Sequence, residues 1–448
     1  MEERVYRFIQ EHALLCLGDD VTVALSGGAD SVALLWVMRR LAPRLELTVR
    51  AAHFHHGIRG EEADRDADFC RSLCRDWNIP FALGRGDAPA RAAQRGESLE
   101  EAARVLRYTF LRSAAPGKLA TAHNGDDNVE TILLHLLRGT GLRGLAGIPL
   151  TGEKLLRPLL CCTRGEIDAL LEREKLPHVE DSTNGKDDCL RNRLRHRVMP
   201  LLREENPSLV RTVGRTSALL REEDAYLSRL AEKAALDCEA GEGLSSRALL
   251  ELDPVLRRRV LMGSLRKLGL ENPAMVYVEG LESLLRAGPS ARMLLPGGLS
   301  ARREYDRLLF GPLQEFPPLP DLSINVPGRT VLPDGLGQLV CFVTKSSNFS
   351  QKKPTTFALK CDMIRLHKFR VRSRLPGDKL CLPGGAKQLK ALMIDRKLPA
   401  QMRAAIPVLT LDGGLIAVFG IGADPSFVAS ENEEAPVIRY EGPLFSNP

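Results

Sequence analysis

The sequence has ten cysteines among its 448 residues but contains no CxxC pair. Cys70 and Cys74 are separated by three residues, and Cys161 and Cys162 are adjacent. Neither spacing suits a zinc knuckle or a redox dithiol, so these two kinds of site are not expected. Scattered cysteines in a chain of this length are most simply reduced thiols in a cytosol, and we therefore expect a cytoplasmic protein.

Long apolar runs are also absent. The first fifteen residues mix charged residues with apolar ones, which is typical neither of a secretory signal nor of a membrane span. The longest apolar runs, such as Leu411 to Ile421, are short and interrupted by glycine, and they predict buried strands. We expect no membrane partner.

Excess charge is small overall, since the net charge is +6, but it is unevenly distributed. From Arg365 to Arg403 there are eleven Lys or Arg and two Asp, a local charge of +9, so the rest of the chain sums to about −3. A stretch of this kind indicates either a phosphate-rich partner or an ordinary solvated face. Its composition alone favours neither interpretation.

The first 160 residues alternate between strand-like and helix-like segments. Strands are predicted at 21–25, 47–54 and 118–122, and helices at about 31–40 and 126–137. Ser98 with Glu101, and Thr163 with Glu166, form capping-box patterns that open two further helices. This alternation predicts an α/β fold, with a doubly wound parallel sheet covered by helices on both faces.

The pattern changes after Pro200. Asn206 followed by Pro207, and Asp253 followed by Pro254, are helix start signals in a mainly helical region that ends in a small hairpin. The proline-rich string from 315 to 322 predicts a linker, and the chain beyond it is β-rich with one helical candidate at 387–396. A composition of 44% hydrophobic residues and this length suggest two or three globular domains. We place them at 1–205, 206–314 and 323–448.

Ser26, Gly27, Gly28, Ala29, Asp30 and Ser31 form an SGGADS string between a predicted strand and a predicted helix. In this setting, glycines let the backbone turn tightly around an anion, and the amides of the helix start point at it. An isolated Gly-Gly would favour an ordinary turn, but the whole string in this context favours phosphate binding. It is not a Walker loop, because no GxxxxGK followed by Ser or Thr occurs. The string resembles the PP-loop of the ATP pyrophosphatases, which implies an ATP site.

A group of acids follows the next predicted strand, where residues 121–131 read TAHNGDDNVET. Paired carboxylates such as Asp126, Asp127 and Glu130 can bind Mg²⁺ or a cationic amine. Acids also suit a helix N-terminus without any ligand. Three acids within five residues, beside His123, favour a functional site. A single histidine is more often structural than catalytic, so we assign no catalytic histidine.

Two sets of arginines are spaced to share a helix face. Arg104 and Arg107 lie three residues apart, and Arg191 and Arg195 lie four apart with Arg193 between them. Guanidinium groups suit phosphates because they remain charged and can bond through two N–H groups at once. Surface ion pairs are the alternative interpretation, and such pairs contribute little. With Arg197, four arginines occur within residues 191–197, after the acidic string at 180–184, and this favours a functional role.

Several motifs, taken together, resemble the tRNA(Ile)-lysidine synthetase family. HNGDDNVET at 123–131 and RGTGLRGL at 138–145 are similar to its AHxxDDxxET and RGxGxxGL patterns. Further similarities are HHGIR at 55–59, ARVLRY at 103–108, RPLL at 157–160, EDSTN at 180–184, RNRLR at 191–195 and RLPGD at 374–378. The match runs from about residue 20 to about residue 424. Gly125, where alanine is usual, and Asn128, where glutamine is commoner, are small departures.

This resemblance implies a two-step, ATP-dependent modification of the isoleucine tRNA with a CAU anticodon. ATP adenylates the C2 oxygen of the wobble cytidine, and the amine of L-lysine then attacks C2. The resemblance implies that residues 26–31 bind ATP and that Asp30 and Asp127 lie near Mg²⁺. It also implies catalytic contacts from Asp30, Arg107 and Arg195, and lysine or Mg²⁺ contacts from Asp126, Asp127 and Glu130. The tRNA-binding candidates are Arg191, Arg193, Arg370, Arg372 and Arg374.

Two other functions stay open at this point. A tRNA thiolase would share the PP-loop, but such enzymes usually need paired cysteines, and the missing CxxC counts against it. A non-catalytic RNA-binding protein would keep the basic stretch but has no need of an intact SGGADS string. The sequence leaves the oligomeric state open, with a homodimer as one arrangement that it allows.

Overall fold

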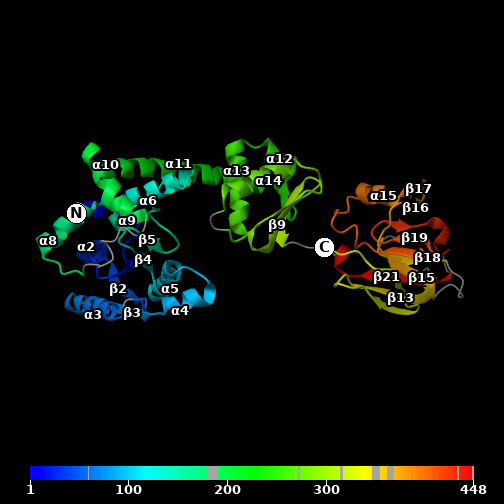
Figure 1. Cartoon of the computed structure of the whole chain (residues 1–448), viewed down its shortest axis with the longest axis horizontal. Helices are drawn as coiled ribbons and strands as arrows, with labels where there is room; N and C mark the ends of the chain where they lie inside the picture. The colour runs from blue at the N-terminus through cyan, green and yellow to red at the C-terminus, as the bar shows by residue number, and fades with distance from the viewer. Residues whose placement is uncertain are drawn as a thin grey trace. The chain divides into compact units, whose positions relative to one another are not determined.

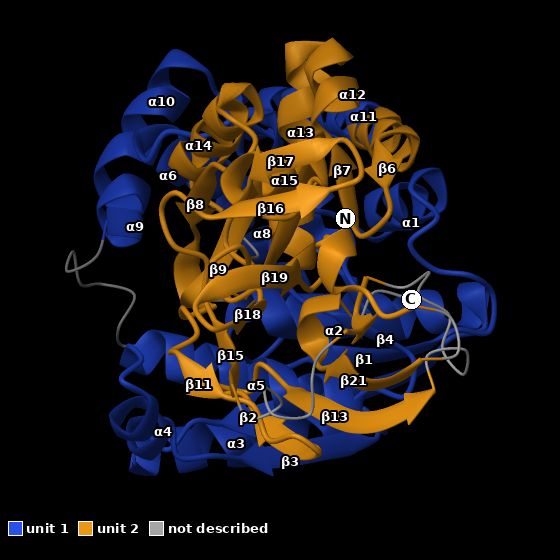
Figure 2. Ribbon diagram, turned by 90° about the vertical axis from the view of Figure 1, so that its right-hand side faces the viewer, with its two compact units in different colours: residues 1–227 blue, residues 228–448 orange. Residues whose placement is uncertain are grey.

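A computed structural model describes residues 1–58, 60–179, 190–270, 273–312, 316–345, 354–360, 368–430 and 433–445 (Figure 1). The chain divides into two compact units, residues 1–227 and residues 228–448 (Figure 2). Within the described ranges, none of the helices has the length and apolar character needed to cross a membrane.

Unit 1 is built on a five-stranded parallel sheet, which confirms the predicted fold class. The strand order is β3-β2-β1-β4-β5. The strands are β1 (Asp20–Ala24), β2 (Thr48–His55), β3 (Phe81–Arg85), β4 (Lys118–Ala120) and β5 (Leu155–Leu156). The chain moves outward from β1 to β3 and then returns to the other side of β1 as β4. The carboxyl ends of β1 and β4 therefore flank the point where strand order reverses, which is where open α/β sheets bind ligands.

The helices in this part of the chain are α1 (Glu2–Glu11), α2 (Ala29–Leu45), α3 (Glu61–Asp76), α4 (Ala88–Arg95), α5 (Leu99–Ala114), α6 (Gly125–Leu137), α7 (Leu142–Leu145), α8 (Arg164–Glu174), α9 (Leu190–Arg193), α10 (Met199–Glu205) and α11 (Leu209–Asp237). Five of them, α2, α5, α6, α8 and α11, begin near positions that the sequence predicted, whereas the others were not predicted. α2 is longer than predicted, because it begins directly after Gly28 and continues past Pro43. Thr163 and Glu166 form the expected capping box, and Ser98 caps α5.

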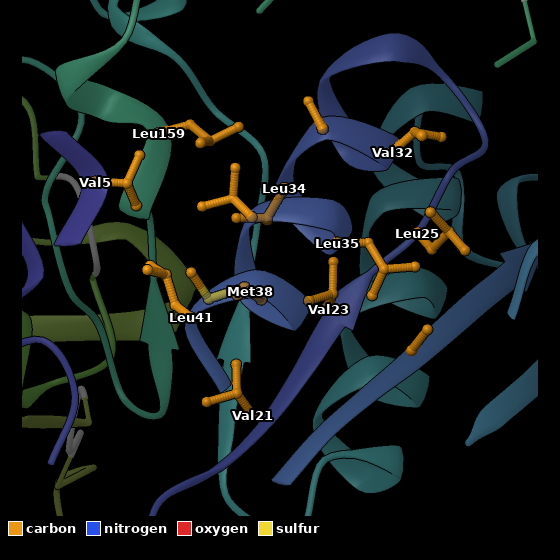
Figure 3. Packing of buried hydrophobic residues seen from close by; sticks show 14 of the residues in the cluster. Val5, Val21, Val23, Leu25, Val32, Leu34, Leu35, Met38, Leu41 and Leu159 are labelled. Atoms are coloured by element: carbon orange, nitrogen blue, oxygen red, sulfur yellow. The ribbon is translucent and has the colours of Figure 1, made fainter. Parts of the chain in front are cut away.

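Alternate residues of the central strand face opposite layers of helices. Val21 and Val23 are fully buried in the largest core, together with Leu34 and Met38 of α2. Figure 3 shows these side chains gathered between β1 and α2. Ala24 instead packs in a second cluster that includes residues of α5. A strand that is buried on both faces reads as a near-continuous apolar run, which explains the sequence pattern.

Unit 2 begins with a helical region closed by a small sheet, as the sequence predicted. Its helices are α12 (Ser246–Glu251), α13 (Pro254–Lys267) and α14 (Met275–Arg286). Asp253 accepts a hydrogen bond from Val255 N and Pro254 occupies the first helical position of α13. The sheet has the order β6-β7-β10-β9-β8, and β9 with β10 forms the expected hairpin. These strands are β6 (Glu239–Ala240), β7 (Gly243–Ser245), β8 (Arg292–Leu294), β9 (Leu299–Glu304) and β10 (Arg307–Pro312).

The remainder of unit 2 is β-rich. Its two larger sheets have the orders β11-β15-β18-β19-β20 and β12-β13-β21-β14, and β16 pairs with β17. The strands are β11 (Leu322–Ser323), β12 (Gly328–Val331), β13 (Gln338–Lys345), β14 (Thr356–Ala358), β15 (Phe369–Arg372), β16 (Lys379–Leu382), β17 (Gly385–Gln388), β18 (Val408–Leu411), β19 (Gly414–Val418), β20 (Gly422–Ala423) and β21 (Glu434–Glu441).

Two expectations for this region need adjustment. The predicted helix is α15 (Leu389–Asp395), and it starts later than expected because Lys387 belongs to β17. The described part of the predicted linker also packs against the β-rich core, where Leu319 is only 4% exposed. Its backbone N–H donates to Ser373 Oγ over 2.6 Å. A proline-rich composition predicted the absence of regular structure, but it could not show that one leucine is buried.

We predict that Leu34→Ala destabilises unit 1 by about 2–5 kcal/mol, because it leaves a cavity in a close-packed core. Leu34 is fully buried, whereas Leu17 is 68% exposed, so Leu17→Ala should change the free energy of unfolding by less than about 0.5 kcal/mol. Both tryptophans of the chain, Trp36 and Trp77, lie in unit 1, so their fluorescence during urea unfolding reports on this unit. Equal losses in the two variants would contradict the assignment of this core.

Candidate functional site

The SGGADS string forms the turn between β1 and α2. Ser31 organises this turn, because its Oγ accepts hydrogen bonds from the backbone N–H groups of Ser26 and Gly27, each over 3.2 Å. The same hydroxyl donates to Gly28 O over 2.8 Å. Gly27 has a φ of +93°, a conformation that favours glycine. α2 then begins at Ala29, and its first amides have no acceptor within the helix. The turn therefore presents donors suited to an anion.

Asp30 lies in the first turn of α2 and is held through both carboxylate oxygens. Asn124 Nδ2 donates to Oδ1 over 3.0 Å, and Arg164 Nη1 donates to Oδ2 over 2.9 Å. Burial raises the pKa of Asp30 above its usual value, and the nearby charge of Asp127 raises it further, while Arg164 opposes both effects. A cation bound at this carboxylate would relieve the repulsion between Asp30 and Asp127.

α6 begins with a capping box at the end of β4. Asn124 Oδ1 accepts from Asp127 N over 3.1 Å, and Asp127 Oδ2 accepts from Asn124 N over 3.0 Å. Asp126 points elsewhere, because it accepts a hydrogen bond from Arg164 N over 2.6 Å and forms an ion pair with Arg203. The three predicted acids therefore separate into Asp126, which anchors α8 and α10, and the pair formed by Asp127 and Glu130.

Asp127 and Glu130 meet Arg191 and Arg195 in one ion-pair cluster. Arg191 Nε donates to Glu130 Oε2 over 2.9 Å, and Arg195 Nε donates to Glu130 Oε1 over 2.6 Å. Both arginines also donate to Asp127 Oδ1, each over 3.1 Å. The Glu130 side chain is only 3% exposed, whereas that of Asp127 is 16% exposed. Asp127 is thus the acid of this pair that is more accessible to a ligand.

A second group of cations surrounds His123. The Arg104 and Arg107 guanidinium groups lie 5.1 and 5.3 Å from the ring centre of Tyr108. Arg157 is buried, donates to Pro149 O over 2.6 Å, and leaves its Nε without a hydrogen-bond partner among the described residues. Burial, together with Arg157 and three further arginines, lowers the pKa of His123 to about 4. His123 is therefore neutral at physiological pH, where this region presents positive charge from its arginines.

The other four arginines predicted to bind tRNA lie at different places in the structure. Arg193 is the last residue of α9. In unit 2, Arg370 Nε donates to Asp321 over 2.8 Å, and Arg372 binds both carboxylate oxygens of Asp378, over 2.8 and 3.0 Å. The Arg372 side chain is only 14% exposed, so this pair is internal to the β-rich region. Arg374 is half-buried.

Three residues that build the site were not predicted from the sequence. Asn124 and Arg164 hold Asp30, and Arg203 pairs with Asp126. Asn124 stood inside a recognised string at a suitable cap position, so it could have been found. No sequence pattern signals the other two, because each meets its acid from a distant part of the chain. The EDSTN string at 180–184 and Arg59 lie outside the described residues.

The two departures from the family pattern have a structural basis. A Cβ atom at Gly125 would lie 2.6 Å from Val210 Cγ1 and 2.9 Å from Cys162 O, so this backbone position is tightly enclosed. Asn128 is buried, donates to Ser217 Oγ over 3.1 Å and accepts from Ile148 N over 2.8 Å. Both residues therefore contribute to the packing of α6, and none of these contacts involves the acids at its start.

The acids near the anion-binding turn can be compared with the requirements of a metal site. In the part of the chain that the structure describes, no group of three or more His, Cys, Asp or Glu side chains is arranged to hold a metal ion. Mg²⁺, however, is commonly held by one or two carboxylates together with substrate phosphates. Asp30 and Asp127, joined through Asn124 beside the anion-binding turn, fit that simpler requirement.

Three family models match successive parts of the chain. Residues 1–202 match a PP-loop domain, residues 244–309 match a TilS substrate binding domain, and residues 369–440 match a TilS substrate C-terminal domain. The PP-loop match includes the SGGADS turn and the ion-pair cluster on α6.

Full-length relatives agree with these matches. A tRNA(Ile)-lysidine synthase from Geobacillus kaustophilus is 35% identical, with 94% of this chain and 95% of the relative covered. One from Dehalococcoides mccartyi is 32% identical, with 98% and 99% covered. The solved structure of the U34-tRNA thiolase NcsA from Methanococcus maripaludis, with its 4Fe–4S cluster, has a TM-score of 0.42 at 18% identity and covers 49% of this chain and 78% of its own. On the strength of its close relatives, the chain belongs to the tRNA(Ile)-lysidine synthase family.

Proposed function

We propose that this protein is an ATP-dependent ligase that joins L-lysine to C2 of the wobble cytidine in the isoleucine tRNA with a CAU anticodon. The observation that carries the proposal is the similarity to tRNA(Ile)-lysidine synthases over nearly the whole chain. The geometry supports it, because the anion-binding turn and a cluster of acids and arginines meet at the carboxyl ends of β1 and β4.

The first step is adenylation of the cytidine. The C2 oxygen attacks the α-phosphorus of ATP, the bond to the bridging oxygen breaks, and pyrophosphate leaves. The amides and hydroxyls of residues 26–31 hold phosphate oxygens, and their preorganised dipoles stabilise the charge that develops on them. Asp30 and Asp127 would hold Mg²⁺ against the phosphates, where the ion would neutralise charge on the oxygens.

The second step is attack by lysine. The amine nitrogen bonds to C2, the bond between C2 and the adenylated oxygen breaks, and AMP leaves with that oxygen. The ammonium group must lose a proton first, so an accessible carboxylate is needed close to C2 as the base that accepts it. We assign that role to Asp127. Glu130 is nearly inaccessible, and we assign it to orienting Arg191 and Arg195.

The arginines supply positive charge for the transferred phosphate. Arg195 is held between Asp127 and Glu130, which fixes its planar group for contact with the adenylate. Arg107 lies with Arg104 beside Tyr108 and contributes to the potential around His123. We assign both Arg107 and Arg195 to stabilising the negative charge of the transition state.

The domain assignment completes the proposal. Residues 1–205 carry the chemistry, residues 206–314 contact substrate, and residues 323–448 bind tRNA through exposed cations. The thiolase alternative is less well supported, since the chain has no CxxC pair. The proposed location is the cytoplasm, where tRNA and ATP are present. The proposed site lies within one chain, so the homodimer stays a prediction that sedimentation would test.

Asp30→Ala should abolish tRNA-dependent release of pyrophosphate, because it removes the acid beside the phosphate-binding turn. The measurement is pyrophosphate release with ATP, tRNA and lysine, and tryptophan fluorescence checks that unit 1 is folded. Asp68→Ala is the matched control, since the Asp68 side chain is 71% exposed on α3. Normal turnover by the Asp30 variant would remove this residue from the mechanism.

Asp127→Asn should raise the KM for lysine more than the KM for ATP, because a neutral amide binds an ammonium group more weakly than a carboxylate does. Asp126→Asn is the matched comparison on the same helix turn. It should lower thermal stability through loss of the Arg203 pair while leaving the KM for lysine nearly unchanged. Parallel increases in the two KM values for Asp127→Asn would indicate that Asp127 only holds the metal and does not also act on lysine.

Neutralising Lys387, Lys390 and Arg396 together should weaken tRNA binding and flatten its salt dependence. Lys387 is exposed on β17, Lys390 on α15 and Arg396 directly after α15. Arg370 and Arg372, in contrast, are engaged in ion pairs. Each phosphate contact that is lost should reduce the slope of log affinity against log salt by about one. ATP binding should be unchanged.

The matched control for this experiment is a triple Gln variant of Arg71, Arg75 and Arg173, whose side chains are 53%, 76% and 59% exposed in unit 1. It removes the same charge from the other unit. If both triple variants lowered affinity and slope equally, tRNA binding would depend on net charge and not on this surface of unit 2.

A further inference from the structure

We infer that Asn124 is a positioning residue that joins the acid of the PP-loop to the acids of α6, so that Asp30 and Asp127 act on one ligand. The inference deepens the proposed function and rests on it for the identity of that ligand, a metal–ATP complex. Asn124 lies at a position that the family pattern leaves open, within the string HNGDDNVET.

The contacts of Asn124 involve both acids at once. Its Nδ2 donates to Asp30 Oδ1 over 3.0 Å, and its Oδ1 accepts from the backbone of Asp127 over 3.1 Å. Its own N–H donates to Asp127 Oδ2 over 3.0 Å. Asn124 is 3% exposed, so these bonds are sheltered from water. One side chain thus fixes the carboxylate of α2 relative to the first turn of α6.

The need for such a link follows from topology and charge. Asp30 and Asp127 follow two different strands, β1 and β4, and are far apart in sequence. Both carboxylates bond to Asn124, and two carboxylates held this near each other repel. Without a donor between them, Asp30 would be free to turn toward Arg164, which holds its other oxygen.

An asparagine suits this role better than the other helix-capping residues. The carboxamide offers a donor and an acceptor in fixed positions without adding charge. Aspartate could still cap α6 but would place a third carboxylate beside the other two. Serine would also cap α6, yet its single hydroxyl lies too close to its own backbone to replace both contacts. The amide N–H of Asn124 therefore serves the positioning role, whereas its amide oxygen serves as the helix cap.

The experiment compares Asn124→Ser, Asn124→Asp and Asn124→Ala in the full-length protein. Binding of ATP with Mg²⁺ is measured by calorimetry, and thermal stability is measured in parallel. Since a hydrogen bond to a charged group is lost, Asn124→Ser should weaken ATP binding about 10-fold or more with nearly unchanged stability. Asn124→Asp should bind more weakly still. Asn124→Ala should lose both ATP affinity and stability, because α6 then lacks its cap.

A double-mutant cycle tests whether Asn124 acts through Asp30. In an Asp30→Asn background, Asn124→Ser should have no further effect on the Kd for ATP, because the acid that it positions is already gone. Equal effects of Asn124→Ser in the two backgrounds would overturn the inference. So would an unchanged Kd in the single Asn124→Ser variant, which would leave Asn124 as a helix cap alone.

These measurements distinguish a failure of the positioning role from a failure of the proposed reaction. If the wild-type protein binds ATP but forms no lysidine on the tRNA, the proposed reaction fails, and the binding cycle still reports on the link between Asp30 and Asn124. If lysidine forms but the cycle shows no coupling, the reaction stands and the positioning role fails.

Discussion

The nearly buried carboxylate of Glu130 is the constraint around which the site in unit 1 is arranged. A buried charge is costly unless it is paired and hydrogen-bonded, and here Arg191 and Arg195 satisfy both of its oxygens. The same two arginines reach Asp127, one helical turn earlier on α6. The cluster therefore ties the segment that begins at Leu190 to α6 and fixes the direction of two guanidinium groups. Removing one partner would leave unpaired charge in a sheltered place.

The parallel sheet determines where this cluster can act. β1 and β4 are neighbours in the sheet although a long stretch of chain, including β2 and β3, separates them. The SGGADS turn follows the carboxyl end of β1, and α6 follows the carboxyl end of β4. The two segments therefore lie side by side at the point where strand order reverses. Asn124 and Arg164 then connect the two loops through Asp30. A rigid scaffold with short polar loops at this edge suits a reaction that depends on holding phosphates and two substrates in order.

The arginines at the site in unit 1 and the basic residues of unit 2 differ in the acids with which they pair. In unit 1, Arg191 and Arg195 face acids within the site, so their charge is directed inward. In unit 2, composition identified a strongly basic stretch, but Arg372 is used internally with Asp378, and Arg370 pairs with Asp321. Lys387, Lys390 and Arg396 are exposed, as the proposed contact with a phosphate backbone requires. Local charge alone could not distinguish these cases, because pairing depends on partners elsewhere in the fold.

The sequence by itself determined the α/β class, the anion-binding turn and the family resemblance, since these depend on local periodicity and on short strings such as SGGADS. The three-residue spacing of Asp127 and Glu130 likewise puts them on one face of any helix that contains both. Only the tertiary structure showed that Asp126 faces away toward Arg203, that Arg164 reaches Asp30, and that Leu319 is buried. Those contacts join residues distant in the chain, and their formation depends on how helices and strands pack, which no local pattern encodes.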